Sequence, residues 1–100
     1  MPFNKAIYKG LPGTVVNIDV NRGELDFVTA KDIAKQKVAT LCTDSMLLSW
    51  YQGRTGESYP NLECGRDDTP AWILYAKSRN GDISVNINDG EYIFIFLSLS

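Results

Sequence analysis

The chain has 100 residues, of which 44% are hydrophobic, 11% aromatic and 22% charged. This is the size and composition of one ordinary globular domain, and it excludes a disordered tail and a collagen-like repeat. Ten Lys and Arg against twelve Asp and Glu leave a formal net charge of −2, which argues against a nucleic-acid binder, since such proteins usually carry an excess of basic residues. The sequence contains no histidine, so Ser-His-Asp and Cys-His catalysis, histidine metal ligands and histidine pH sensing are excluded.

Signals for export and for membrane insertion are missing from the sequence. Residues 1–5 contain no apolar segment of a secretory signal, and no stretch approaches the roughly 20 apolar residues of a transmembrane helix. We therefore expect a cytoplasmic protein that makes no use of a membrane. Cys42 and Cys64 are too far apart for a CxxC pair. They are expected to be reduced, as is usual in the cytosol, with a disulfide between them as the alternative.

A β-hairpin is predicted over residues 14–28. Val16, Ile18 and Val20 alternate with polar residues, and residues 21–23 supply turn chemistry. The alternation then resumes through Leu25 and Phe27, against acidic neighbours. A further short strand is expected at 5–9.

One long helix is predicted to follow, from residue 29 to about residue 52. Thr29 and Asp32 have the spacing of a capping box, and Gly53 is a suitable stop. The stretch 43–45 favours caps over helix interiors, so we expect either a kink there or the start of a second short helix. The predicted apolar stripe consists of Ile33, Ala34, Val38, Leu41, Cys42, Ser45 and Leu48.

Three strands are predicted in the last third of the chain, at 72–75, 83–88 and 91–97. The Asn80-Gly81 and Asp89-Gly90 pairs indicate the turns between them. The expected fold is α+β: a single antiparallel sheet in the order hairpin, helix, three-strand meander, with one long or kinked helix packed on one face. The whole chain is expected to form a single domain, 1–100.

The last strand is apolar on both faces, whereas one helix can cover only one of them. The N-terminal segment, the long loop or a second subunit must therefore cover the other face, because an uncovered strand of this kind would aggregate. A self-association surface is the leading hypothesis. Its candidate residues are Tyr92, Ile93, Phe94, Ile95 and Phe96.

The loop 53–70 is the richest polar stretch. Its two arginines could bind a carboxylate or phosphate through paired hydrogen bonds, or could instead pair with the acids of the same loop. The aromatic residues around it, including Tyr51, form either a small core beneath the loop or a binding surface. The candidate residues for ligand or partner binding are Trp50, Arg54, Glu57, Tyr59, Arg66 and Trp72.

These patterns predict a non-catalytic interaction domain that binds a protein partner, or itself as a homodimer, through the last strand and the 53–70 loop. One alternative is the binding of a small molecule or a metal ion at that loop. Another is a weak enzyme that uses the loop carboxylates Asp67 and Asp68. No cofactor, metal site or catalytic residue is predicted, and no motif identifies a family.

Overall fold

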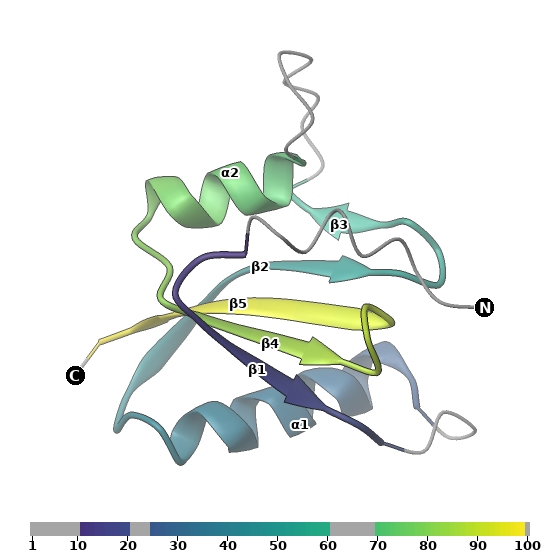
Figure 1. Ribbon diagram of the computed structural model, residues 1–100, viewed down its shortest axis with the longest axis horizontal. Helices are drawn as coiled ribbons and strands as arrows, with labels where there is room; N and C mark the ends of the chain where they lie inside the picture. The colour runs from purple at the N-terminus through teal and green to yellow at the C-terminus, as the bar shows by residue number, and fades with distance from the viewer. Residues whose placement is uncertain (1–10, 21–24, 61–69, 100) are drawn as a thin grey trace.

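The computed structural model describes residues 11–20, 25–60 and 70–99. The elements of these ranges are β1 (Thr14–Ile18), α1 (Phe27–Ala39), β2 (Ser45–Gln52), β3 (Ser58–Tyr59), α2 (Ala71–Ser78), β4 (Ile83–Ile87) and β5 (Tyr92–Ser98). The strands form one sheet in the order β1-β4-β5-β2-β3, with α1 below it and α2 above it in the view of Figure 1. Within these ranges, neither helix is long and apolar enough to cross a membrane.

The sheet is mixed, so the predicted antiparallel sheet is wrong. β1 runs parallel to β4, with Thr14 opposite Ile83 and Ile18 opposite Ile87. The pairs β4–β5, β5–β2 and β2–β3 are antiparallel. A parallel pair needs a long crossover, and here everything from α1 to α2 separates the two strands in the sequence.

The lower face of the sheet packs against α1. This helix buries Ala30, Ala34 and Val38, which recur every fourth residue and therefore share one side of the helix. Small side chains let the helix approach the sheet closely, where it meets the large residues of the central strands. The sheet side of this core comprises Ile83, Val85, Ile87, Tyr92, Phe94 and Phe96.

The upper face packs against α2, which buries Trp72, Ile73 and Ala76. Its core includes Ile93 and Ile95 of β5, the residues that alternate with those facing α1. The prediction of one helix on one face is therefore wrong. The sequence correctly indicated that both faces of the last strand need cover, but α2, rather than a second subunit, provides it.

The predicted hairpin over 14–28 is also wrong. β1 ends at Ile18 and pairs with β4, while Phe27 begins α1 instead of a second strand. The side chain of Asp26 caps the helix by accepting a hydrogen bond of 2.8 Å from the N–H of Thr29, so the cap lies three residues before the predicted one. Apolar residues that alternate with acids over so short a stretch fit a helix entrance as well as a strand.

The long helix predicted to residue 52 ends at Ala39, and its second half is the strand β2. The predicted stripe continued through Ser45 and Leu48, but both belong to β2. This strand contains a β-bulge, since its register with β5 shifts between Leu47 and Ser49. Leu47 and Trp50 therefore both pack on the α1 side of the sheet, although they are three residues apart. A bulged strand thus imitates the spacing of a helix.

The segment predicted as a strand at 72–75 is the helix α2, since a short apolar run does not distinguish the two structures. Asn80-Gly81 ends this helix rather than forming a hairpin turn. Gly81 N–H donates to Ala76 O (2.8 Å) and Asn80 N–H to Lys77 O (3.1 Å), the two bonds of a Schellman motif. The strands predicted at 83–88 and 91–97 are confirmed as β4 and β5. The strand expected at 5–9 lies outside the described residues.

Candidate functional site

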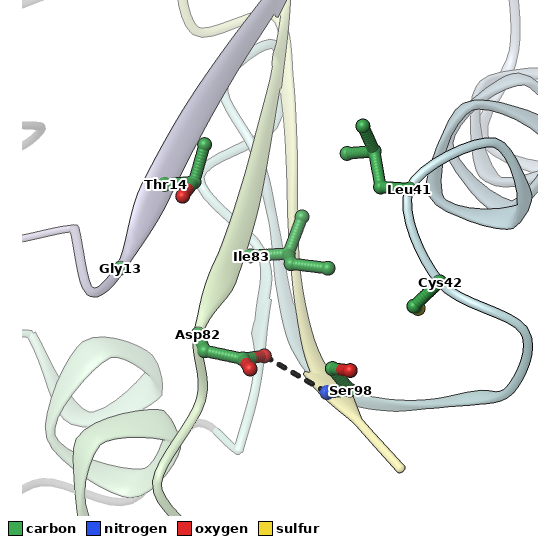
Figure 2. Close-up of a pocket in the computed structure, with 7 residues that line it drawn as sticks. All are labelled: Gly13, Thr14, Leu41, Cys42, Asp82, Ile83 and Ser98. Carbon is green, nitrogen blue, oxygen red and sulfur yellow. Dashed lines mark hydrogen bonds between the residues drawn. The ribbon is translucent and has the colours of Figure 1, made fainter. Parts of the chain in front are cut away.

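A pocket of about 520 Å³ opens at the end of the sheet where β1 and β4 begin and β5 ends. The connection from α1 to β2 forms its opposite wall, as Figure 2 shows. Its volume falls in the range of natural sites for small ligands. The lining residues are Gly13, Thr14, Leu41, Cys42, Asp82, Ile83 and Ser98.

Gly13 and Asp82 join the first residues of β1 and β4 tightly. Thr14 N–H donates to Asp82 O at 2.9 Å, and Gly13 has a φ of +68°, in the left-handed region. A Cβ on Gly13 would lie 2.1 Å from the carbonyl oxygen of Asp82. Only glycine permits both this backbone conformation and this approach.

Asp82 is the charged residue of the pocket. Its Oδ1 accepts a hydrogen bond of 2.8 Å from the N–H of Ser98, at the end of β5 (Figure 2). Its main-chain N–H donates to Phe96 O at 3.0 Å. The residue is nevertheless exposed, so its carboxylate is held in place and still open to solvent.

The apolar wall of the pocket comes from Ile83 on β4 and from Leu41, whose side chain is 50% exposed. Next to Leu41 lies the thiol of Cys42, which is free. Its Sγ lies 3.3 Å from Asp44 O and 3.7 Å from Val38 O, and either oxygen can accept its single S–H hydrogen. An activated nucleophile needs a base or a cation beside it, whereas these partners are carbonyl oxygens. Cys64 lies outside the described residues.

Exposed apolar side chains gather around the same end of the sheet. Met46 of β2 is 50% exposed and lies opposite Leu97 of β5. Leu99 is 49% exposed, and its N–H extends the pairing by donating to Asp44 O at 2.9 Å. Alternation along the strand places Leu99 on the same face as Leu97 and its partner Met46, which is the α2 face of the sheet. Cys42 and Ile83 of the pocket pack instead in the α1 core, so the pocket and the side chains of Met46 and Leu99 lie on opposite faces at the same end of the sheet. We call the surface formed by Leu41, Met46, Asp82, Leu99 and the pocket the pocket end.

The opposite end of the sheet, which we call the turn end, is formed by the β4–β5 turn and the residues bound to it. Glu91 is buried there at 3% exposure and accepts a hydrogen bond of 2.8 Å from Asn88 Nδ2. Arg54 Nη1 lies 3.4 Å from Glu91 Oε2 and 3.3 Å from Leu25 O. Arg54 therefore joins three segments of the chain at the turn end.

The predicted residues of the 53–70 loop do not form one site in the described structure. Arg54 pairs with Glu91 of the β4–β5 turn. Glu57 and Thr55 bond with each other, through Thr55 Oγ1 to Glu57 Oε1 at 3.2 Å and Glu57 N–H to Thr55 Oγ1 at 3.1 Å. Arg66 lies outside the described residues, as do Asp67 and Asp68.

The predicted aromatic residues are divided between the two faces of the sheet. Trp72 is 2% exposed and stacks on Tyr51, with ring centroids 5.0 Å apart. Trp50 instead lies 4.7 Å from the ring of Phe27 at the start of α1. Tyr59 is 53% exposed and stacks beside Trp50 at 6.4 Å. Trp72 is thus a core residue, and Tyr59 is a surface residue on the short edge strand β3.

The five candidate self-association residues lie inside the chain. Tyr92 is 4% exposed, Phe96 is 1% exposed, and Ile93, Phe94 and Ile95 are fully buried. β5 also pairs with β4 on one side and β2 on the other. The strand therefore offers a second subunit neither a free edge nor an exposed face.

Sequence reasoning missed the pocket. Its residues come from four separate stretches of the sequence, and none of them belongs to a recognised motif. Gly13 and Asp82 were not among the candidate site residues, and Leu41 and Cys42 were assigned to a helix. Within the described ranges, no group of three or more Cys, Asp or Glu side chains could hold a metal ion.

Comparisons with known proteins identify the fold and the family. The structure is similar to the crystal structure of protein AF1514 from Archeoglobus fulgidus DSM 4304, with a TM-score of 0.75 and 22% identity over 88% of this chain and 96% of that chain. At this identity the likeness shows a shared fold. The search of curated proteins gives no match. Residues 13–96, which include nearly every described element, match a family profile. The chain therefore belongs to the family described as Domain of unknown function (DUF5619).

Proposed function

We propose that this protein is a non-catalytic binding domain that receives a protein partner on the pocket end. The observation that carries the proposal is the position of the exposed apolar side chains. Leu41, Met46 and Leu99, half of the six large apolar side chains exposed in the described ranges, belong to the pocket end. Single exposed apolar residues are ordinary, but several of them at one end of a sheet, beside a pocket, favour an interaction site there.

The polar groups of the pocket end suit a partner better than they suit catalysis. Asp82 and Asp44 are exposed at the edge of the apolar group, which matches the usual arrangement of a polar rim around an apolar centre. The thiol of Cys42 donates to a carbonyl oxygen, and the sequence has no histidine to activate it. The charge of the two aspartates favours a partner surface that carries basic residues.

This proposal moves the predicted interaction surface. The sequence suggested the last strand and the 53–70 loop. The strand is buried, and Arg54 and Glu57 make contacts within the chain. The pocket end instead combines a concave site with exposed apolar area, so it supports partner binding better than either predicted region.

Selection from a peptide library displayed on phage tests the proposal. The protein is the bait, and the enriched peptides are measured by fluorescence anisotropy against three proteins: wild type, the double variant Leu41→Ser/Met46→Ser, and the control Val28→Ser. Val28 is 71% exposed in the first turn of α1, away from the pocket end. We expect the double variant to weaken binding at least about tenfold and the control to leave it unchanged.

Two results would overturn the proposal: a selection that enriches no peptide, or peptides that bind the double variant as tightly as the wild type. Sedimentation equilibrium of the same proteins measures self-association and so tests whether the partner is a second copy of the chain. Self-association that the double variant abolishes and Val28→Ser preserves would support the pocket end as the surface and identify the partner as the chain itself.

A further inference from the structure

We infer that the pocket binds a protonated alkylamine, such as the side chain of a lysine. The inference rests on the proposed function for one point only, that the amine belongs to a protein partner. The pocket is expected to bind the ammonium group and its alkyl chain, whichever molecule carries them.

The charge of the pocket favours a cation. Asp82 is the only charged residue among those described as lining it, and its carboxylate is exposed to the pocket and to solvent. Leu41 and Cys42 directly follow Thr40, the C-cap of α1. The C-terminus of a helix carries a partial negative charge, which attracts cations. Asp82 and the C-terminal end of α1 lie on opposite walls of the pocket, and both favour a cation between them.

The hydrogen-bonding groups of the pocket fit an ammonium group. An ammonium has three donors and no acceptor. The pocket walls hold the Asp82 carboxylate and the hydroxyls of Thr14 and Ser98, each of which can accept a hydrogen bond (Figure 2). This arrangement fits a compact point charge with freely directed donors.

The same geometry disfavours a guanidinium. Arginine binds a carboxylate best when its planar fork meets both oxygens at once. Asp82 Oδ1 already accepts from Ser98 N–H at 2.8 Å, so a fork would have to share that oxygen. We therefore expect the pocket to prefer lysine over arginine.

The apolar wall fits the stem of the same ligand. Ile83 and the half-exposed Leu41 face each other across the pocket in Figure 2. Lysine and arginine side chains commonly lay their methylene stems on apolar surface while the charged head reaches a polar group. A four-carbon chain thus places its carbons between Leu41 and Ile83 and its ammonium beside Asp82.

An NMR titration with n-butylammonium tests the inference on the whole protein labelled with ¹⁵N. The probe lacks the rest of a lysine, so we expect a dissociation constant in the millimolar range, in line with the limited affinity of very small ligands. The expected shifts concentrate at the amides of Thr14, Cys42, Ile83 and Ser98. At equal ionic strength, n-butanol, n-butyrate and n-butylguanidinium are expected to bind more weakly.

The key variant is Asp82→Asn, which keeps an oxygen to accept from Ser98 N–H, removes the charge and replaces the second acceptor oxygen with an amide NH2. The matched control is Asp89→Asn, at an exposed position of the turn end where asparagine tolerates the positive φ of 56°. We expect Asp82→Asn to weaken n-butylammonium binding roughly tenfold, the usual effect of losing one charge-assisted hydrogen bond. The control is expected to bind as the wild type does.

A second readout uses the thiol at the pocket wall. In a Cys64→Ser protein, we expect n-butylammonium to slow the reaction of Cys42 with N-ethylmaleimide, and n-butyrate to have no such effect. The inference is overturned when n-butylammonium shifts no pocket amide in the wild type, or when Asp82→Asn binds it equally well.

The outcomes separate this inference from the proposed function. When n-butylammonium binds through Asp82 and the peptide selection fails, the amine site stands and its source is a free small amine. When selected peptides depend on Leu41 and Met46 but not on Asp82, the binding function stands and the amine inference is wrong. Peptides that carry lysine, and that Asp82→Asn weakens, support both.

Discussion

The two ends of the sheet each hold a carboxylate, and their surroundings differ in a way that separates structure from binding. At the turn end, Glu91 is 3% exposed, 2.8 Å from Asn88 Nδ2 and 3.4 Å from Arg54 Nη1. A charge removed from water must be paired and hydrogen-bonded. The partners of Glu91 meet that need, and they tie the β4–β5 turn to the loop after β2.

At the pocket end, Asp82 is exposed and is oriented by one hydrogen bond, from Ser98 N–H. It is positioned by the backbone without being covered. A carboxylate in this state can exchange water for a ligand at little cost, whereas Glu91 would first have to lose its partners. The comparison teaches that a binding carboxylate is better sought among groups that are held and open than among those that are buried and paired.

The largest expected effect concerns the core that the two ends share. Phe94→Ala removes a fully buried ring of β5 and is expected to lower the free energy of unfolding by about 3–5 kcal/mol. Urea denaturation measures this change, with Val28→Ala on the surface as a control expected to stay within about 0.5 kcal/mol. A Phe94→Ala protein that kept its stability but changed its oligomeric state would restore the self-association hypothesis for β5.

The pocket end is expected to be sensitive at Gly13. Gly13→Ala places a Cβ 2.1 Å from Asp82 O at a φ of +68°, so we expect a loss of about 3 kcal/mol, from strain and steric overlap together. Gly56→Ala is the matched control, because its φ is +81° but nothing lies within 4 Å of the added atom. It is expected to cost only about 1–2 kcal/mol, from the backbone conformation alone. Thermal and urea denaturation give both values, and equal losses would contradict the tight β1–β4 junction.

A pair of charge-removing variants compares the two carboxylates directly. Glu91→Gln keeps a hydrogen-bonding side chain and removes the ion pair with Arg54, and we expect a loss of about 1–2 kcal/mol, a modest value because Arg54 is 53% exposed. Asp82→Asn is expected to change stability by less than about 0.5 kcal/mol. The two are compared by urea denaturation at neutral pH. A larger loss for Asp82→Asn would mean that the pocket carboxylate has a structural role.

The smallest expected effect lies at the entrance of α1. The pKa of Asp26 is below its usual value of 3.8, because the main-chain N–H and the hydroxyl of Thr29 hydrogen-bond to the carboxylate. The folded protein thus holds this proton less tightly than the unfolded chain. The resulting stabilisation is present above pH 3.8 and is lost as the pH falls through the lower, folded value.

Asp26→Asn isolates this contribution, since asparagine caps a helix about as well as aspartate but does not titrate. We expect the wild type to melt slightly higher than Asp26→Asn at neutral pH, and the difference to disappear below pH 3.8. Melting temperatures followed by circular dichroism from about pH 7 to about pH 2.5 measure it. A difference that persisted at the lowest pH would show that the charge of Asp26 does not stabilise α1.

The errors of the sequence interpretation have specific physical causes. The helical stripe was extended through Ser45 and Leu48, but a three-residue spacing over so short a stretch does not distinguish a helix from the strand β2 that these residues form. The apolar run at 72–75 is equally compatible with a buried strand and with the short helix it forms. The pairing of β1 with β4 is invisible to local patterns, because 64 residues lie between the end of β1 at Ile18 and the start of β4 at Ile83.

The candidate site was harder to predict than the fold. The loop residues were chosen because they are polar and close in sequence, but Arg54 is used at the turn end and Trp72 in the core. The pocket instead joins Gly13, Leu41, Asp82 and Ser98, which lie far apart in the sequence. Such a constellation exists only after the sheet has formed.

The sequence by itself determined the properties that depend on composition and short-range pattern. These are the α+β class, the hairpin of β4 and β5 with its turn at residues 88–91, the exclusion of histidine chemistry, and the need to cover both faces of the last strand. Only the tertiary structure decided that α2 provides the second cover, that β1 lies beside β4, and that Asp82 is held open at one end of the sheet while Glu91 is buried at the other. The physical reason is that the periodicity of apolar residues indicates which side of a helix or strand is buried. Which other element packs against that side depends on contacts between residues far apart in the sequence.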